Sequence, residues 1–224
     1  AIQRLTADIA DGLGLPKDKG EIVANVEASG PAGRAGVKQG DVILKVAGRD
    51  VDYDNSLSYI VATTPIGSTV PIELVRDGKR VTINATIAQR PSEAVVAQRA
   101  GMPANEDETP AEDGSKAPGI EAAKASLGIT LQPITPVLRQ QLRIDEKVQG
   151  VVIAGISPAS DAASKGLQRG DIILKIGQTP VKNPAEAAAA VELERKAGKD
   201  TVLMLVQRGT TPPVYRGIKL IPAK

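Results

Sequence analysis

The stretch GLQRGDIILKI, residues 166–176, decides the fold because the chain contains it twice. Its other copy is GVKQGDVILKV, residues 36–46. In each copy a glycine stands where a helix would end, a Gly-Asp turn follows, and a mainly apolar run predicts a strand. The duplication predicts one supersecondary unit that the chain uses twice.

The similarity extends outward from this unit in the same order in both copies. Residues 2–6 match 131–135, residues 20–23 match 150–153, residues 29–32 match 157–160, and residues 74–78 match 205–209. Repeats of about 90 residues are whole domains, since solenoid repeats are shorter. We therefore expect one domain over residues 1–90 and a second over residues 125–222.

Residues 91–124 separate the two copies and have no sustained apolar period. The segment contains Pro103, Pro110 and Pro118, and between residues 92 and 118 six acidic residues outnumber two basic ones, a net charge of −4. This composition predicts a solvated, flexible, acidic linker. A segment that folds back onto a basic groove is the alternative.

Each copy has the same expected order of elements around an N-terminal strand. Helices are expected at 7–14, 31–35 and 55–63 in the first copy and at 136–142, 158–165 and 184–196 in the second. Strands are expected at 21–26, 42–46, 69–76 and 80–87 in the first copy and at 150–156, 172–176, 201–207 and 214–220 in the second. Asn183 before Pro184 predicts a capped start for the last helix. The pattern predicts an α+β, mainly β fold: two domains, each a small partly open β-barrel with two or three helices.

The composition excludes several classes of function. The 224 residues include no cysteine and no histidine, so the chain can form neither a Ser-His-Asp triad nor a zinc site with those ligands. The only aromatic residues are three tyrosines and the net charge is +2, so we expect no nucleic acid partner. No apolar run approaches the roughly 20 residues of a membrane helix, so we expect no stable membrane insertion. We expect no cofactor, no metal and no enzymatic activity of this chain.

Asp41 and Asp171 follow glycine in both copies and could be mistaken for catalytic acids. An aspartate in a tight turn commonly accepts hydrogen bonds from the backbone of that turn. We therefore expect both to be structural.

A second polar group suggests a Ser-Lys nucleophile, and its members are Ser160, Asp161, Ser164 and Lys165. The first copy has Gly30, Pro31, Arg34 and Ala35 at the matching positions. A catalytic role would therefore exist in one copy only, and helix capping is the simpler interpretation.

The segment Leu127-Gly128-Ile129 is the best candidate for a binding loop. An apolar strand follows it, and the long helix of the same copy can lie beside that strand and leave a groove. An extended peptide could add there as a further strand, while successive loop amides bind its terminal carboxylate. Gly128 would let the backbone approach the carboxylate without a Cβ in the way. An ordinary turn glycine is the alternative.

The order of these motifs resembles bacterial PDZ domains: the Leu-Gly-Ile loop, the Ser-Pro-Ala segment, the Gly-Asp unit and a closing Arg-Asp-Gly-Lys turn. Two such domains in tandem, with Thr64-Pro65-Ile66-Gly67 before a strand of the first, resemble the C-terminal half of Deg/HtrA-type envelope serine proteases. The trypsin-like domain of that family has no match in this chain.

The resemblance implies a periplasmic parent protein, a serine endopeptidase and chaperone for misfolded proteins. It implies partners of two kinds: C-terminal or unfolded hydrophobic peptide segments, and the protease domain of the parent chain. The isolated fragment is expected to be a monomer and the parent a trimer-based oligomer, since the protease domain carries trimerisation in this family.

The resemblance also assigns the peptide-binding residues. In the second domain they are Ser126, Leu127, Gly128, Ile129, Thr130 and Leu131 of the loop and strand, with Ala188 and Val191 on the helix. In the first domain they are Ala1 and Ile2 on the strand and Ser58 and Val61 on the helix. The carboxylate-binding loop of the first domain would lie before Ala1, so the first groove is expected to be truncated in this chain.

The alanines at residues 187–190 predict a roomy second groove that prefers peptides ending in Phe or Leu to those ending in Ala. Alanine is also simply a good helix former. Three alternatives for the whole chain stay open at this point. They are a module chiefly for oligomerisation and cage assembly, the PDZ tandem of another envelope protein such as a membrane metalloprotease, and an enzyme in its own right.

Overall fold

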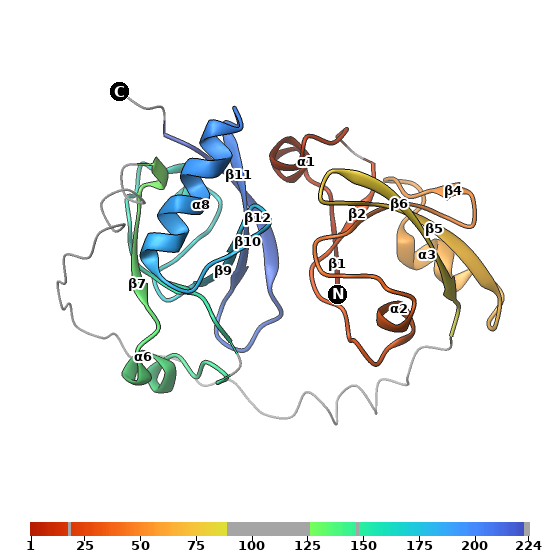
Figure 1. Cartoon of the computed structure of the whole chain (residues 1–224), viewed down its shortest axis with the longest axis horizontal. Coiled ribbons are helices and arrows are strands. Elements are labelled where there is room, and N and C mark those ends of the chain that lie inside the picture. Colours follow the sequence, from red (N-terminus) through yellow and green to blue (C-terminus); the bar gives the residue numbers. More distant parts are fainter. Residues whose placement is uncertain (18, 89–125, 147, 222–224) are drawn as a thin grey trace.

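The computed structural model describes residues 1–17, 19–88, 126–146 and 148–221, and it contains two antiparallel sheets of six strands each (Figure 1). The first sheet is built from residues before 88 and the second from residues after 126. The linker predicted over residues 91–124 lies entirely outside the described residues. The domain boundaries at 90 and 125 stay predictions.

The first sheet has the strand order β1-β2-β3-β5-β6, with β4 paired to β3. Its strands are β1 (Ile2–Arg4), β2 (Glu21–Val23), β3 (Val42–Val46), β4 (Arg49–Asp50), β5 (Thr69–Arg76) and β6 (Lys79–Thr86). The second sheet has the order β12-β11-β9-β8-β7, with β10 paired to β9. Its strands are β7 (Ile129–Pro133), β8 (Val151–Ile156), β9 (Ile172–Ile176), β10 (Thr179–Pro180), β11 (Thr201–Gln207) and β12 (Val214–Lys219). Neither order closes on itself, which confirms the prediction of mainly β, partly open domains.

Three helices accompany each sheet within the described ranges. They are α1 (Ala7–Leu13), α2 (Pro31–Arg34) and α3 (Leu57–Ala62) in the first domain, and α6 (Pro136–Gln141), α7 (Asp161–Ser164) and α8 (Pro184–Lys196) in the second. Helix α8 begins as predicted, because Asn183 accepts a hydrogen bond from the Glu186 N–H and Pro184 occupies the first turn.

Two helices begin later than the sequence predicted, because serine caps set their starts. Helix α7 was expected from residue 158 and begins at Asp161, since the Ser160 side chain accepts a hydrogen bond from the Ala163 N–H at 3.2 Å. Helix α3 was expected from residue 55 and begins at Leu57, since Ser56 caps the Tyr59 N–H at 3.2 Å.

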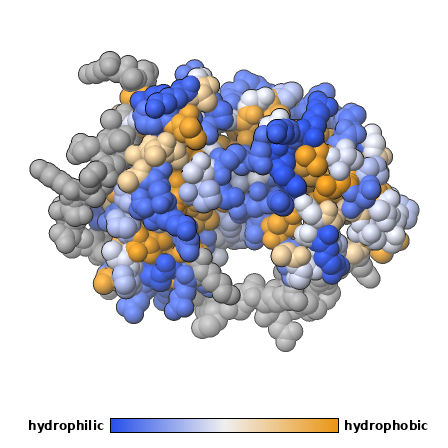
Figure 2. Space-filling model, viewed as in Figure 1, coloured by the Kyte–Doolittle hydropathy of each residue, from blue (hydrophilic) through white to orange (hydrophobic). Residues whose placement is uncertain are grey.

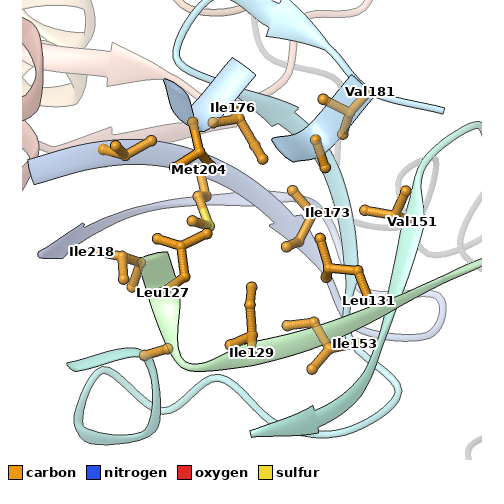
Figure 3. Packing of buried hydrophobic residues seen from close by; sticks show 14 of the residues in the cluster. Leu127, Ile129, Leu131, Val151, Ile153, Ile173, Ile176, Val181, Met204 and Ile218 are labelled. Carbon is orange, nitrogen blue, oxygen red and sulfur yellow. The ribbon is translucent and has the colours of Figure 1, made fainter. Parts of the chain in front are cut away.

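Each sheet buries one face against one helix, which is α3 in the first domain and α8 in the second. The core of the second domain joins β7 and the neighbouring strands to α8, and includes Ile129, Leu131, Val191 and Met204 (Figure 3). The core of the first domain likewise joins Ile60 of α3 to β3 and β5. On the outside, hydrophilic residues surround smaller apolar patches on the face in Figure 2. We call α3 and α8 the groove helices, and we refer to the face of each sheet away from its groove helix as its outer face.

The structure corrects the last part of the repeat by one residue. Val42 pairs with Val75 in the first sheet, and the equivalent Ile172 pairs with Gln207 in the second. Arg76 is therefore equivalent to Arg208, whereas the sequence match of 74–78 with 205–209 had placed Arg76 against Gln207. The sequence match failed because it aligned Gly78 with Gly209, and the turns that contain these glycines differ in length: two residues join β5 to β6, and six join β11 to β12.

Candidate peptide-binding groove

Strand β7 is an edge strand of the second sheet and pairs with β8 on one side only. Helix α8 lies beside it, as Figure 1 shows, and the two elements are in contact. Along β7 the residues alternate between the core and the opposite face: Ile129 and Leu131 are completely buried, and Thr130 between them is half-buried. The backbone edge of β7 is therefore the part of the strand that remains for a ligand.

The segment before β7 was predicted as a loop, but its residues Ser126 and Leu127 are helical and only Gly128 forms a bend. The Ser126 carbonyl accepts a hydrogen bond from the Ile221 N–H at 2.8 Å, and the Gly128 carbonyl accepts one from the Ser157 N–H at 2.7 Å. Leu127 between them points into the core near Met204 and Ile218 (Figure 3). These contacts fix the shape of the segment, which we continue to call the loop.

Gly128 is required by this loop for two reasons. Its φ is +68°, where residues with a Cβ are strained, and a Cβ built on it would lie 2.6 Å from the Cβ of Ser160. We had expected the glycine to make room for a carboxylate, and the structure shows that it first makes room for Ser160. Binding of a carboxylate by this loop stays a prediction.

The two predicted helix residues of this groove differ in burial. Val191 is 1% exposed and belongs to the core cluster together with Leu127, Ile129 and Leu131. Ala188, one turn earlier, is 9% exposed and lies at the edge of that core. The structure therefore brings the predicted loop, strand and helix residues of the second domain together, with Val191 beneath Ala188. The roomy pocket stays a prediction.

The predicted residues of the first groove are more exposed. Ile2 on β1 is 40% exposed, Ser58 on α3 is exposed, and Val61 packs from α3 against the core of the first domain. The Ala1 carbonyl accepts hydrogen bonds from the N–H groups of Ala24 and Asn25, at 3.0 and 3.1 Å, and so continues the pairing of β1 with β2.

The Gly-Asp turns are structural in both domains, as predicted. The Asp41 carboxylate, 1% exposed, accepts a hydrogen bond from the Lys38 N–H at 2.7 Å, within its own turn. Arg76 donates two further hydrogen bonds to it, from Nε at 2.7 Å and from Nη2 at 2.6 Å. Asp171 has the same partners in the second domain, the Gln168 N–H and Arg208.

We call the pairs Asp41–Arg76 and Asp171–Arg208 the Asp-Arg clamps. Their arginines were not identified from the sequence, because the repeat had been aligned one residue off. The hydrogen bonds to Asp41 and Asp171 raise the pKa of Arg76 and of Arg208 above the ordinary value. Each arginine also donates to a helix-end carbonyl, that of Gly36 or Gly166, and so joins the end of β5 or of β11 to the turn.

The polar group on α7 is structural as well. Ser160 caps the helix and donates a hydrogen bond to the Ser157 carbonyl at 2.6 Å, and Ser164 donates to the Asp161 carbonyl at 2.8 Å. Lys165 forms an ion pair with Asp8 of the first domain. The residues thus pair with other partners and form no Ser-Lys dyad.

The described residues include neither a helix that could span a membrane nor a cluster of metal ligands. None of their helices has the length and apolar character needed to span a bilayer. They also include no group of three or more acidic, histidine or cysteine residues that could hold a metal ion.

Family models for the PDZ domain match the chain twice, at residues 12–87 and 120–207. Together they cover most of the chain; the first match omits β1 and most of α1, and the second omits β12. The chain therefore belongs to the PDZ domain family, as a tandem of two such domains.

The tandem is similar to proteins that are described as DegP-like. It is 33% identical over 206 residues to a probable periplasmic serine endoprotease, DegP-like, of Brucella suis; the match covers 92% of this chain and 36% of that protein. A protein of the same description from Rickettsia conorii is 30% identical over 213 residues, covering 94% of this chain and 39% of that protein. The chain thus spans little more than a third of the length of these relatives.

Solved structures of HtrA-type proteins are also similar to parts of the chain. The HtrA-type protease AlgW with a decapeptide is 34% identical, with a TM-score of 0.36 over 41% of this chain and 28% of that one. The PDZ domain of HtrA3 bound to a phage-derived ligand, FGRWV, is 27% identical, with a TM-score of 0.35 over 42% of this chain and 83% of that one.

Proposed function

We propose that this chain is the non-catalytic, peptide-binding part of a periplasmic serine endoprotease of the Deg/HtrA type. In this proposal the second domain binds C-terminal or exposed hydrophobic segments of misfolded proteins as an additional strand on β7. The observation that carries it is the unpaired edge of β7 beside α8, preceded by a pre-shaped loop with Gly128 at positive φ. The similarity of 92% of this chain to a DegP-like probable periplasmic serine endoprotease supports the rest.

Each part of the groove would bind a different part of the ligand: its backbone, its terminal carboxylate or its last side chain. The edge of β7 from Ile129 to Leu131 supplies backbone donors and acceptors, which are indifferent to the sequence of the ligand. The backbone amides of residues 127–129 would bind the terminal carboxylate, because successive amides in a turn form an anion-binding concavity. Ala188 at the rim of α8 would border the side chain of the last ligand residue, and Val191 would support it from the core.

The role of the whole protein follows as a proposal of the same kind. A protease domain outside this sequence would cleave what the PDZ domains hold, in a trimer-based assembly in the periplasm. The tandem would thereby regulate which polypeptides reach the protease.

The pentapeptide FGRWV offers a direct test, because it contains the only tryptophan in a mixture with this chain. Its fluorescence anisotropy on titration with the chain measures binding without a label. We expect the free acid to bind about tenfold more tightly than the C-terminal amide, since charge-assisted hydrogen bonds to the carboxylate are lost in the amide. Equal affinities would refute the carboxylate loop.

A matched pair of variants assigns the binding to one groove. Ala188→Glu places a charge at the rim of the second groove, and Ser58→Glu does the same at the matching position of the first. We expect the former to weaken FGRWV binding and the latter to leave it within twofold. Peptides with Phe, Leu or Ala at the C-terminus then test the roomy pocket, which predicts Phe and Leu above Ala.

A further inference from the structure

Helix α1 of the first domain lies between the two sheets and contacts β11 and β12 of the second domain (Figure 1). The contact contains a hydrophobic cluster from both domains. The first domain contributes Leu5, Ile9, Ala10, Ile22, Ala24, Val42 and Val75, and the second contributes Leu203, Leu205 and Tyr215. All of these residues are at most 8% exposed, so the cluster is as deeply buried as the core of a domain.

Gly217 of β12 allows the close approach of α1 to the second sheet. A Cβ on Gly217 would lie 2.5 Å from the carbonyl oxygen of Asp8, whereas a Cβ on Gly12 of α1 would make an ordinary van der Waals contact with Leu203 at 3.5 Å. Gly217 is buried in a strand interior, where glycine is otherwise unfavourable. The second sheet therefore has a small residue at the position where the helix of the other domain touches it.

Polar contacts give this interface one register. The Gln3 side chain donates a hydrogen bond to the Tyr215 carbonyl and accepts one from the Tyr215 N–H, both at 2.8 Å. It thus satisfies the backbone of the edge strand β12 as a neighbouring strand would. The ion pair of Asp8 with Lys165 lies at the same interface.

The part of the outer face of the first sheet that lies on β5 and β6, away from Val42 and Val75 of the cluster, shows what such a surface is like without a partner. Strand pairing makes Pro71, Glu73, Thr82 and Asn84 equivalent to Leu203, Leu205, Tyr215 and Gly217. The former set is exposed or half-buried and mainly polar, whereas the latter is buried and mainly apolar. An apolar outer face with a glycine opposite a helix is therefore specific to the second domain.

We infer that the outer face of β11 and β12 is a docking surface for the first PDZ domain of the same chain, and that docking positions β1 through Gln3. Strand β1 is the strand on which the first groove would bind a peptide, so this last consequence rests on the proposed function. The docking itself does not rest on the proposed function. Gln3 is a positioning residue in this scheme. Its side chain holds β1 from the outer face of the sheet, whereas a peptide would pair with the backbone edge of β1.

Gly217→Val tests the docking. Valine suits an extended strand of the isolated second domain, but its Cβ collides with the backbone of α1 in the docked chain. Asn84→Val is the matched control, since it makes the corresponding change on the exposed outer face of the first sheet. We expect Gly217→Val to increase the radius of gyration in small-angle scattering and Asn84→Val to leave it unchanged, with both domains folded by circular dichroism.

Three outcomes would overturn the docking. They are an extended wild-type chain, a scattering profile that Gly217→Val does not alter, and a wild-type dimer that this variant converts to a monomer. In the last case the surface would bind a second copy.

Hydrogen exchange tests the positioning of β1 with no ligand. Gln3→Ala should speed exchange of the β1 amides about tenfold, and Gln132→Ala, at the matching position of β7, should leave β7 unchanged. Unchanged protection of β1 in Gln3→Ala would refute the positioning role. Binding of FGRWV, followed by NMR at α3 and at α8, separates this inference from the proposed function. Loss of all binding with intact docking would refute the function alone, and normal binding without docking would refute the inference alone.

Discussion

At four equivalent positions of the two sheets the chain has Pro71, Glu73, Thr82 and Asn84 in one domain and Leu203, Leu205, Tyr215 and Gly217 in the other. The inner faces do not differ in this way: both are apolar and pack against the groove helix. The Asp-Arg clamps are also the same in both domains. The comparison teaches that the inner face and the clamp specify the PDZ fold, whereas the outer face is free to become a contact surface.

Removing the clamp tests the shared part of the comparison and should have the largest effect. Asp171→Ala leaves Arg208 without its carboxylate and the Gln168 N–H without an acceptor. We expect it to lower the free energy of unfolding of the second domain by about 3 kcal/mol, at the low end for a buried pair because the arginine is half exposed. Asp41→Ala should cost the first domain a similar amount. Urea denaturation followed by circular dichroism measures both, and a loss below about 1 kcal/mol in either domain contradicts an equivalent clamp.

High pH tests the part of the comparison in which the domains differ, the outer face of β11 and β12, through the phenol of Tyr215. Burial at the interface, with a smaller contribution from the negative charge of Asp41, raises the pKa of Tyr215 to about 12 from the ordinary value of 10.0. Docking therefore has its full strength below pH 10. It weakens between about pH 10 and 12 by up to roughly 1.4 kcal/mol per pH unit, because the undocked chain loses the phenolic proton first.

Small-angle scattering against pH measures this loss. Tyr215→Phe keeps the ring and removes the phenolic proton, so its docking should weaken less than that of the wild type over the same range. A wild-type response no larger than that of Tyr215→Phe would contradict the prediction.

Two glycines with the same backbone conformation sharpen the comparison at the loop. Gly128 and Gly14 have φ of +68° and +67°, but only Gly128 has a close neighbour, since nothing lies within 4 Å of a Cβ on Gly14. Gly14→Ala should cost about 1 kcal/mol for the left-handed backbone alone. Gly128→Ala should cost about 2 kcal/mol or more, because Ser160 must also shift. Equal losses in thermal unfolding would show that the contact with Ser160 carries no weight.

The smallest effect is expected at the caps of the two groove helices, which the domains share. Asn183→Ala and Ser56→Ala each remove one side-chain acceptor from the first turn of α8 or α3. Each should lower the free energy of unfolding by about 1 kcal/mol. A loss near zero in one domain only would mean that its first turn finds another partner.

The sequence predicted most of the fold because the repeat supplied two independent views of each element. Strands β3, β5, β9 and β11 have the predicted bounds, and the predicted helices differ from the observed ones only at capped ends. The loop residues, β7 and α8 are brought together as the motif order indicated. Their role in binding is still a prediction.

The interface between the domains was not predicted, because it depends on tertiary contacts that no local pattern describes. Two signals were present in the sequence. The run TVLMLVQ, residues 201–207, is apolar on both faces of its strand, which is typical of a strand covered on both sides. Gly217 interrupts the next strand, and such a glycine often marks the close approach of another backbone. The equivalence of Arg76 with Arg208 was missed for a different reason, since unequal turns shift the repeat.

The amide of Gln3 has a consequence for ligands with more than one binding segment. If it fixes β1 against β12, the two grooves are held at one separation, and the linker no longer sets how far apart they are. For a polypeptide that reaches both grooves, the second contact then has an effective concentration determined by the spacing of its own segments. Avidity would favour those unfolded chains whose hydrophobic segments match that spacing, so the tandem would select by distance as well as by sequence.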